Sequence, residues 1–462
     1  MFKKFIGDKA FYRHVAAIAL PIILQNGISN FVSLLDNIMV GQVGTMEMSG
    51  VSVVNQLMMV FYLCVFGATS GAGIFTAQFH GSRDQEGIRF TFRFKVLICV
   101  LLSLLGAAIF LFAGDALVNA YLQGEGSAED AATTLQHAKS YLRVKQVGLP
   151  PFAMTNVYAS TMRECGKTTV PMVAGIVAVL VNLVGNYILI FGNFGAPKMG
   201  VAGAALATVI SRYVELAIVA LWTHLHAKEY LYIRGAYRSL YIPRKLFGNI
   251  LTKGMPLLAN EFMWSAGIAT LSQCYSTCGL DVVPALNITT TISNLSSVVF
   301  LAVGSTVGII MGQMLGANRP VPEIRDHNRK LIALGVSSGV VFGGLMASIS
   351  GVFPLLYNTE DSVRELATGL ILIAAAAIPI GAYLNPAYFT LRSGGKTMIT
   401  FLFDSGFVWG VSIPVAFCLS RFTDMPILPL YAICQALDLI KCVVGFILVK
   451  KGVWIQNLTT KE

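Results

Sequence analysis

Three carboxylates lie in apolar stretches of the sequence with no residue of opposite charge within one helical turn. They are Asp36, Glu261 and Asp404. An ionised side chain costs about 2.5 to 3.5 kcal/mol at the centre of a membrane-inserted helix, so such residues mark candidate functional sites. A carboxylate in a low-dielectric cleft can take up a proton on one side of a membrane and release it on the other, or it can supply the negative charge of a sodium site. The sequence therefore predicts three candidate residues for reversible cation binding.

Neutral polar residues that could complete such sites occur in two places. Asn182 and Asn186 are four residues apart, on one face of a predicted helix, and they are candidate oxygen donors beside Asp36. The run 289–294 carries three threonines, a serine and Asn294, and these groups could serve a sodium ion at Glu261. Polar residues within spans also hold helices together by hydrogen bonds, which is the alternative reading of this run. For Asp36 the alternative is a residue at the membrane interface.

Other charged residues in apolar stretches have simpler explanations. Two i,i+3 pairs of opposite charge can neutralise themselves on one helical face: Arg212 with Glu215, and Asp438 with Lys441. Arg143 and Lys145 fall near the outer end of a predicted span, where we expect their side chains to reach toward the interface.

The elements that must position these residues are membrane-spanning helices. Of the 462 residues, 55% are hydrophobic and 12% are charged, whereas a soluble domain carries about 25% charged residues. The apolar residues form twelve blocks of about 20 residues, the length needed to cross a bilayer. We therefore expect an all-α polytopic membrane protein in which any chemistry takes place within the helix bundle.

The two halves of the chain repeat one another. Aligned at an offset of 235 residues, the identical pairs are Pro21 with Pro256, Gly44 with Gly279, Gly73 with Gly308, Gln78 with Gln313 and Gly81 with Gly316. Further pairs follow at an offset of 229: Asn156 with Asn385, Arg163 with Arg392 and Gly166 with Gly395. Duplicated halves around a functional cleft are a construction of secondary transporters. We predict a six-helix lobe over 1–226, a cytoplasmic connector over 227–249 and a second six-helix lobe over 250–462, related by a pseudo-twofold axis.

Basic residues are concentrated in alternate connections between the predicted spans. One group, Arg83, Arg89, Arg93 and Lys95, falls between the second and third spans, and another fills the connector. The connection over 38–50 has no Lys or Arg. This pattern places the basic loops and both termini in the cytoplasm of a cell whose plasma (inner) membrane holds the protein. The net charge of +10 then reflects orientation and contact with anionic lipids, and we expect no nucleic-acid partner.

Features of an enzyme are weak in this sequence. The six histidines stand at span ends or in loops, and none pairs with a carboxylate at metal-ligand spacing except by chance. Cys274 and Cys278 lie on one helical face but lack the further ligands of a zinc site. We therefore expect a protein without enzymatic activity and without a cofactor.

Several of these segments together resemble the multidrug and toxic compound extrusion (MATE) family, and in particular its NorM-like branch. The resemblance covers nearly the whole chain and is carried by four segments, 35–44, 182–192, 260–267 and 312–316. It implies two six-helix lobes and a cation-coupled antiporter that exports amphipathic organic cations while protons or sodium ions enter. It also implies a small-molecule cargo and, we expect, a monomer surrounded by lipid.

The resemblance assigns roles to three residues. Asp36 matches the acidic residue of the first helix that is linked to cation coupling, Glu261 matches a cation-binding Glu of the seventh helix, and Asn182 matches an Asn near the first-lobe site. Some branches have an Asp where this chain has Asn186, which removes a titratable group from the first lobe and raises the weight on Glu261 as the coupling residue. Asp404 matches no assigned family site. The rival interpretation is a flippase of the same superfamily that moves a lipid or a lipid-linked oligosaccharide, although the spans hold few cations for a pyrophosphate.

Overall fold

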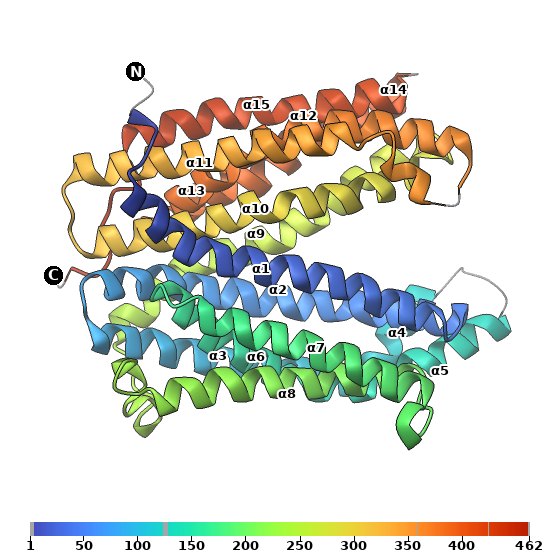
Figure 1. Ribbon diagram of the computed structural model, residues 1–462, viewed down its shortest axis with the longest axis horizontal. Coiled ribbons are helices and arrows are strands. Elements are labelled where there is room, and N and C mark those ends of the chain that lie inside the picture. The colour runs from blue at the N-terminus through green and yellow to red at the C-terminus, as the bar shows by residue number, and fades with distance from the viewer. Residues whose placement is uncertain (1–3, 123–127, 358, 424, 461–462) are drawn as a thin grey trace. The chain divides into compact units, whose positions relative to one another are not determined.

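The computed structural model describes residues 4–122, 128–357, 359–423 and 425–460, and the regular structure within these ranges is helical (Figure 1). The first eight helices are α1 (Lys9–Gly41), α2 (Thr45–Gly81), α3 (Gln85–Phe112), α4 (Gly114–Leu122), α5 (Ala128–Lys145), α6 (Leu149–Glu164), α7 (Thr169–Phe191) and α8 (Val201–Leu225). The others are α9 (Arg244–Ser276), α10 (Val282–Gly316), α11 (Val321–Ser348), α12 (Asp361–Ser393), α13 (Thr397–Phe401), α14 (Ile413–Phe422) and α15 (Ile427–Lys451). Short 3-10 turns occupy Gln146–Gly148, Asn193–Gly195, Leu231–Ile233, Ala236–Arg238 and Phe353–Leu356.

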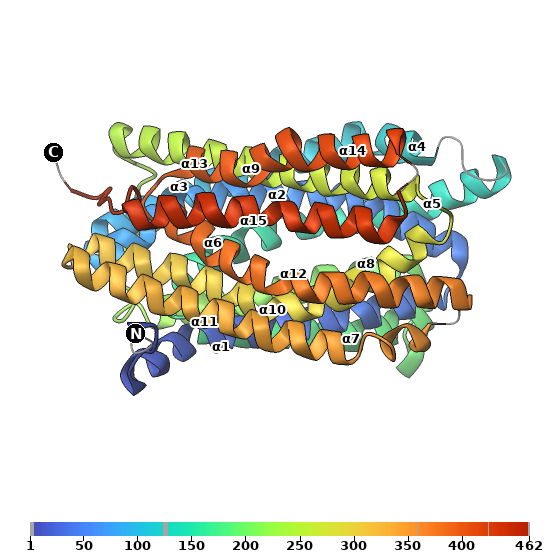
Figure 2. The same cartoon turned by 90° about the horizontal axis from the view of Figure 1, so that it is seen from above.

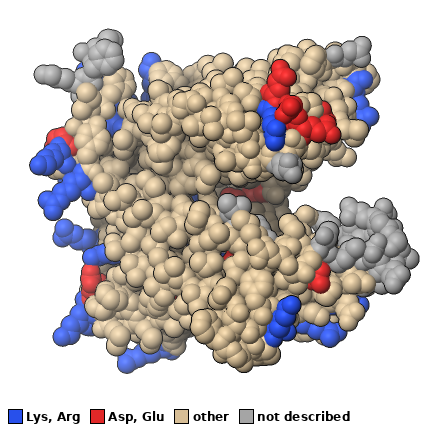
Figure 3. Space-filling view, turned by 45° about the vertical axis from the view of Figure 1, so that its right-hand side comes forward, with Lys and Arg blue, Asp and Glu red and all other residues tan. Residues whose placement is uncertain are grey.

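Ten spans in these ranges are long and apolar enough to cross a membrane, with α13, α14 and the turns between them forming one of the ten. The α5–α6 segment and α9 fall outside that set. The α5–α6 segment is interrupted at Gln146–Gly148, and α9 carries Asn260 and Glu261 near its middle. On the face drawn in Figure 3, most charged side chains lie near the margins and uncharged ones cover most of the surface between them.

The chain forms two compact units. The N-unit comprises Leu24–Thr76 and Asp84–Leu251, and the C-unit comprises Met1–Ile23, Ala77–Arg83 and Thr252–Glu462. The first part of α1 belongs to the C-unit because Val15 and Ile18 pack into its hydrophobic core with residues of α10. The predicted lobes, which follow the sequence repeat, stay a prediction.

Close helix contacts in the C-unit depend on glycine. Helices α10, α11 and α12 lie side by side (Figures 1 and 2). Gly335, Gly339 and Gly343 follow one another at four-residue intervals along α11, and a Cβ at any of them would press on α12. A stripe of small residues allows two helix backbones to approach closely and so to gain dispersion contacts within a membrane.

The repeat is visible as a reciprocal contact between α2 and α10. A Cβ on Gly81 would collide with the backbone carbonyl of Gln313, and a Cβ on Gly316 would collide with the carbonyl of Gln78. Gln78 and Gln313 are repeat mates, and so are Gly81 and Gly316. Each contact is therefore the counterpart of the other, as a local twofold relation between the two helix ends requires.

The basic group expected in a loop between the second and third spans lies mostly within a helix. Asp84 caps α3 by accepting a hydrogen bond from the Gly87 amide at 2.9 Å, so the helix begins at Gln85. Arg93 donates to the carbonyls of Ala236, Gly235 and Tyr241 at 2.8, 2.9 and 3.1 Å, which anchors the connector.

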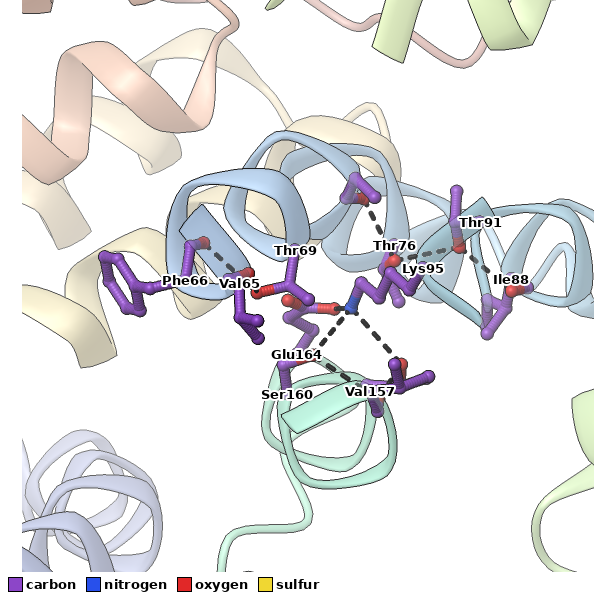
Figure 4. A network of polar contacts seen from close by, with 12 residues as sticks. Val65, Phe66, Thr69, Thr76, Ile88, Thr91, Lys95, Val157, Ser160 and Glu164 are labelled. Atoms are coloured by element: carbon purple, nitrogen blue, oxygen red, sulfur yellow. Dashed lines mark hydrogen bonds and ion pairs between the residues drawn. The ribbon is translucent and has the colours of Figure 1, made fainter. Parts of the chain in front are cut away.

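The position of Lys95 on α3 also differs from the prediction, because its side chain is fully buried. Its ammonium lies 2.5 Å from a carboxylate oxygen of Glu164 and donates to Ser160 and Thr161 on α6 (Figure 4). Lys95 is therefore half of a buried ion pair rather than part of the orientation signal.

Candidate cation-coupling sites

Asp36 lines a pocket of roughly 400 Å³ within the N-unit. Helices α1, α2, α5, α7 and α8 all contribute to its lining, and the Asp36 side chain is half-buried there. The volume lies in the range of ordinary small-molecule sites. The structure places Asn182 and Asn186 beside Asp36, since both line the same pocket.

The two asparagines act as hydrogen-bond donors toward the carboxylate. Asn186 donates its amide N–H to Asp36 Oδ1 at 2.7 Å. In the amide orientation that satisfies both of its neighbours, Asn182 donates to Asp36 Oδ2 at 2.7 Å and accepts from the Thr208 backbone amide at 3.2 Å. Hydrogen bonds from two amides stabilise an ionised carboxylate without neutralising its charge. The asparagines were expected to present oxygens, whereas here they present nitrogen to Asp36.

The structure contradicts the predicted position of Lys145 at the membrane interface. Only 9% of the residue is exposed, and its ammonium donates to Asn55 Oδ1 at 3.0 Å and to the Tyr141 hydroxyl at 2.5 Å. The lysine was expected to reach the interface because it falls near the outer end of a predicted span, but the chain continues through Gln146–Gly148 into α6 and keeps it inside the unit. Arg143, two residues earlier, is exposed and lines a different, shallow pocket.

Arg212 and Glu215 form the predicted pair, with Arg212 Nη1 2.8 Å from Glu215 Oε2. Both also line the Asp36 pocket. The pocket therefore holds two acids and two bases, which the sequence did not indicate.

In the C-unit, Asn260 connects α9 to the segment that carries Asp404. Its side-chain Nδ2 donates to Asp404 Oδ2 at 3.2 Å, and its side-chain Oδ1 accepts from the Ser405 hydroxyl at 2.7 Å. Asn260 is 3% exposed. The backbone takes π-helical turns at Leu402–Gly406 and Val408–Ser412, a distortion that is frequent at functional sites.

Asp404 also has a cationic neighbour on another helix. Lys441 on α15 lies 3.4 Å from Asp404 and 3.6 Å from Asp438. The predicted Asp438–Lys441 pair is thus confirmed, but the lysine is shared. The interpretation of Asp404 as an acid without an ionic partner holds only within its own helix.

Glu261 is half-buried on α9, one residue beyond Asn260. Within the described part of the chain its side chain makes no hydrogen bond and no ion pair, and Arg392 and Asp404 are the charged groups near enough to act on it. Asn294 on α10 has an exposed side chain, and no contact joins it to Glu261 among the described residues. The structure therefore brings Asp404 toward Glu261 and leaves Asn294 apart.

Sequence reasoning missed several residues of these two sites, among them Asn55, Tyr141, Asn260 and Arg392. Asn260 stands next to Glu261, and Arg392 is a repeat mate of Arg163, so both carried a signal in the sequence. Asn55 and Tyr141 carried none, because their role depends on the approach of α2 to α5.

Comparison with known proteins agrees with this architecture. The sequence profile of the MatE family matches residues 21–188 and 256–418, one segment in each half of the repeat. The probable multidrug resistance protein YoeA of Bacillus subtilis is 23% identical over 428 residues, which are 90% of this chain and 89% of that protein. The probable multidrug resistance protein NorM of Thermotoga maritima is 23% identical over 423 residues, covering 90% and 87%.

Solved structures share the fold. A multidrug resistance MATE family transporter of the MOP superfamily in an outward-facing conformation superimposes with a TM-score of 0.87 at 17% identity, over 97% of both chains. A MOP superfamily transporter from Pyrococcus furiosus, described as having a binding pocket of reverse polarity, gives 0.82 at 19% identity over 99% and 98%. The all-α, twelve-helix fold predicted from the sequence is confirmed. The protein is a multi-pass membrane protein with relatives named as multidrug resistance transporters, and the chain belongs to the MatE, or multidrug and toxic compound extrusion, family.

Proposed function

We propose that this protein is a cation-coupled antiporter that exports amphipathic organic cations by alternating access, in exchange for protons or sodium ions. The observation that carries the proposal is the Asp36 carboxylate, which faces a drug-sized pocket and is held by two neutral amides. Because no cation lies within ion-pair distance of it among the described residues, the carboxylate is available to a transported one. The small-molecule substrates that the relatives' names imply fit the size of this pocket.

Coupling requires that the entering cation and the cargo prefer different conformations of the protein. In this proposal Asp36 and Glu261 take up the coupling cation, Asn182 and Asn186 fix the Asp36 carboxylate, and Asp404 assists Glu261. The Asn186 Oδ1 atom, which is buried without a hydrogen-bond partner, supplies a neutral oxygen beside Asp36. Glu261 or Asp36 with such oxygens would hold a sodium ion, and either alone would hold a proton; Asn294 is a more remote candidate ligand.

Both termini lie in the cytoplasm of the host cell in this proposal, and the protein acts in the plasma (inner) membrane as a monomer, without a cofactor or a nucleic-acid partner.

The proposal is tested with everted membrane vesicles in which proton and sodium gradients are imposed separately and accumulation of a fluorescent organic cation is recorded. Wild-type protein should accumulate the dye under one of the two gradients. Glu261→Gln and Asp36→Asn should each abolish gradient-driven accumulation while the protein remains in the membrane in normal amounts. Asp115→Asn is a matched control, since Asp115 pairs with Lys139 at 2.9 Å and its side chain is 63% exposed. Undiminished accumulation by both site variants would refute the roles given to these residues.

A further inference from the structure

The Asp36 pocket contains a buried lysine that cation coupling does not require. Lys145 lines the pocket and is only 9% exposed. The hydrogen-bond partners of its ammonium are neutral: the Tyr141 hydroxyl and Asn55 Oδ1. Within the described residues no carboxylate comes within 4 Å of its ammonium. An ammonium has three N–H donors, and two have acceptors here, so the third remains for a ligand.

Two further polar atoms of the same pocket are buried without partners. They are Asn186 Oδ1, which is an acceptor, and Arg212 Nε, which is a donor. A buried polar atom without a hydrogen bond destabilises the protein unless a ligand or water satisfies it. Both residues line the pocket, Asn186 next to Asp36 and Arg212 in its ion pair with Glu215.

The formal charges of the pocket cancel. Asp36 and Glu215 contribute two negative charges, and Lys145 and Arg212 contribute two positive ones. Because Asp36 and Lys145 are each bound by neutral groups, the two charges stay separate instead of forming an ion pair. A molecule with a single positive charge would be attracted by Asp36 but repelled by Lys145. A molecule with a positive and a negative group would be attracted at both ends and would leave the pocket neutral.

We propose that the Asp36 pocket selects zwitterionic cargo, with the cationic group of the molecule at Asp36 and a carboxylate or similar anion at Lys145. This inference rests on the proposed function and narrows its cargo to molecules whose cationic group is accompanied by an anionic one. Lys145 acts as the anion-binding residue, and Tyr141 and Asn55 hold its ammonium toward the pocket.

Two dyes provide a matched pair of probes. Rhodamine 110 and rhodamine 123 share one cationic ring system, but rhodamine 110 has a free carboxylate where rhodamine 123 has its methyl ester. The dissociation constant of each is measured by fluorescence anisotropy on the purified protein in detergent. One charge-assisted hydrogen bond should make rhodamine 110 bind at least about tenfold more tightly than rhodamine 123.

Variants of the lysine locate the effect. Lys145→Gln should bring the ratio of the two dissociation constants close to one, and Lys145→Arg should keep rhodamine 110 the tighter ligand. Arg143→Gln is the matched control, because Arg143 is exposed and lines a different pocket, so its ratio should equal that of wild type. Thermal melting of each variant identifies any that fail to fold, and the wild-type ratio decides the question even then.

A wild-type ratio near one, or a ratio that persists in folded Lys145→Gln protein, would overturn the proposal. The proposed function stands or falls separately: it survives if rhodamine 123 accumulates in vesicles under a cation gradient, and it fails if neither dye does.

Discussion

Two lysines inside the N-unit show how a membrane-embedded cation can be stabilised in different ways. Lys95 has a carboxylate partner, Glu164, at 2.5 Å together with two hydroxyl groups, whereas Lys145 has only a phenol and an amide oxygen. A fully compensated pair holds helices together and cannot readily exchange its partner. A cation with neutral partners retains its attraction for an anion, which is why Lys145 and not Lys95 is a candidate ligand for cargo.

The Lys95–Glu164 pair predicts a stability effect. Lys95→Met leaves the Glu164 carboxylate buried without its cation, and removal of one partner of a buried pair costs about 3 to 5 kcal/mol. We therefore expect a marked fall in the melting temperature of purified protein. In the double variant Lys95→Met/Glu164→Met neither member of the pair is left without the other, so part of the stability should return. Equal melting temperatures for wild type and Lys95→Met would show that the pair contributes nothing.

At the scale of elements, the contact between α2 and α10 makes a prediction about glycine. The Cβ that Gly316→Ala introduces meets the backbone carbonyl of Gln78, which cannot move without displacing α2. Overpacking of this kind costs about 1 to 3 kcal/mol, and thermal denaturation should show the loss. Gly344→Ala on α11 is the control, because nothing lies within 4 Å of its new Cβ. It should leave stability unchanged or raise it slightly, since alanine favours helix; an equal loss in both variants would contradict the packing argument.

The anchoring of the connector by α3 makes a second prediction at this scale. Arg93→Gln shortens the side chain and removes three hydrogen bonds to the carbonyls of Gly235, Ala236 and Tyr241. Chymotrypsin should then cleave after the exposed Tyr237 and Tyr241 several-fold faster than in wild type, because local opening exposes the backbone. Arg238→Gln serves as the control, since that exposed side chain makes no hydrogen bond among the described residues. Similar cleavage rates for all three proteins would show that Arg93 does not restrain the connector.

At the scale of the whole molecule, twelve crossings with both termini in the cytoplasm predict which ends of the helices face outward. Residue 423, after α14, should lie outside, and residue 460, beyond α15, should lie inside; both are exposed. A membrane-impermeant maleimide should therefore label Thr423→Cys in intact cells and Thr460→Cys only in everted vesicles. The natural cysteines, among them the exposed Cys418, are first replaced by serine to remove background. Labelling of both positions from the same side would contradict the assigned orientation.

The sequence by itself determined the all-helical membrane fold, the duplicated scaffold and the identity of the acidic candidates. Apolar length and the cost of a buried charge are properties of local sequence, and they need no knowledge of neighbouring helices. It also predicted that Asn182 and Asn186 lie beside Asp36, and the structure brings α7 to α1 at that point.

Tertiary structure alone decided which charges have partners. Lys145 ends a polar helix and precedes the turn at Gln146–Gly148, so from the sequence it resembled an interfacial residue. Only the packing of α2 against α5 places its ammonium between Tyr141 and Asn55. Lys95 resembled a loop cation until α6 brought Glu164 within 2.5 Å, and Asp404 had no partner in its own helix until α15 supplied Lys441. Electrostatic energy depends on distances between helices and on the water excluded around them, and these quantities exist only once the helices have packed.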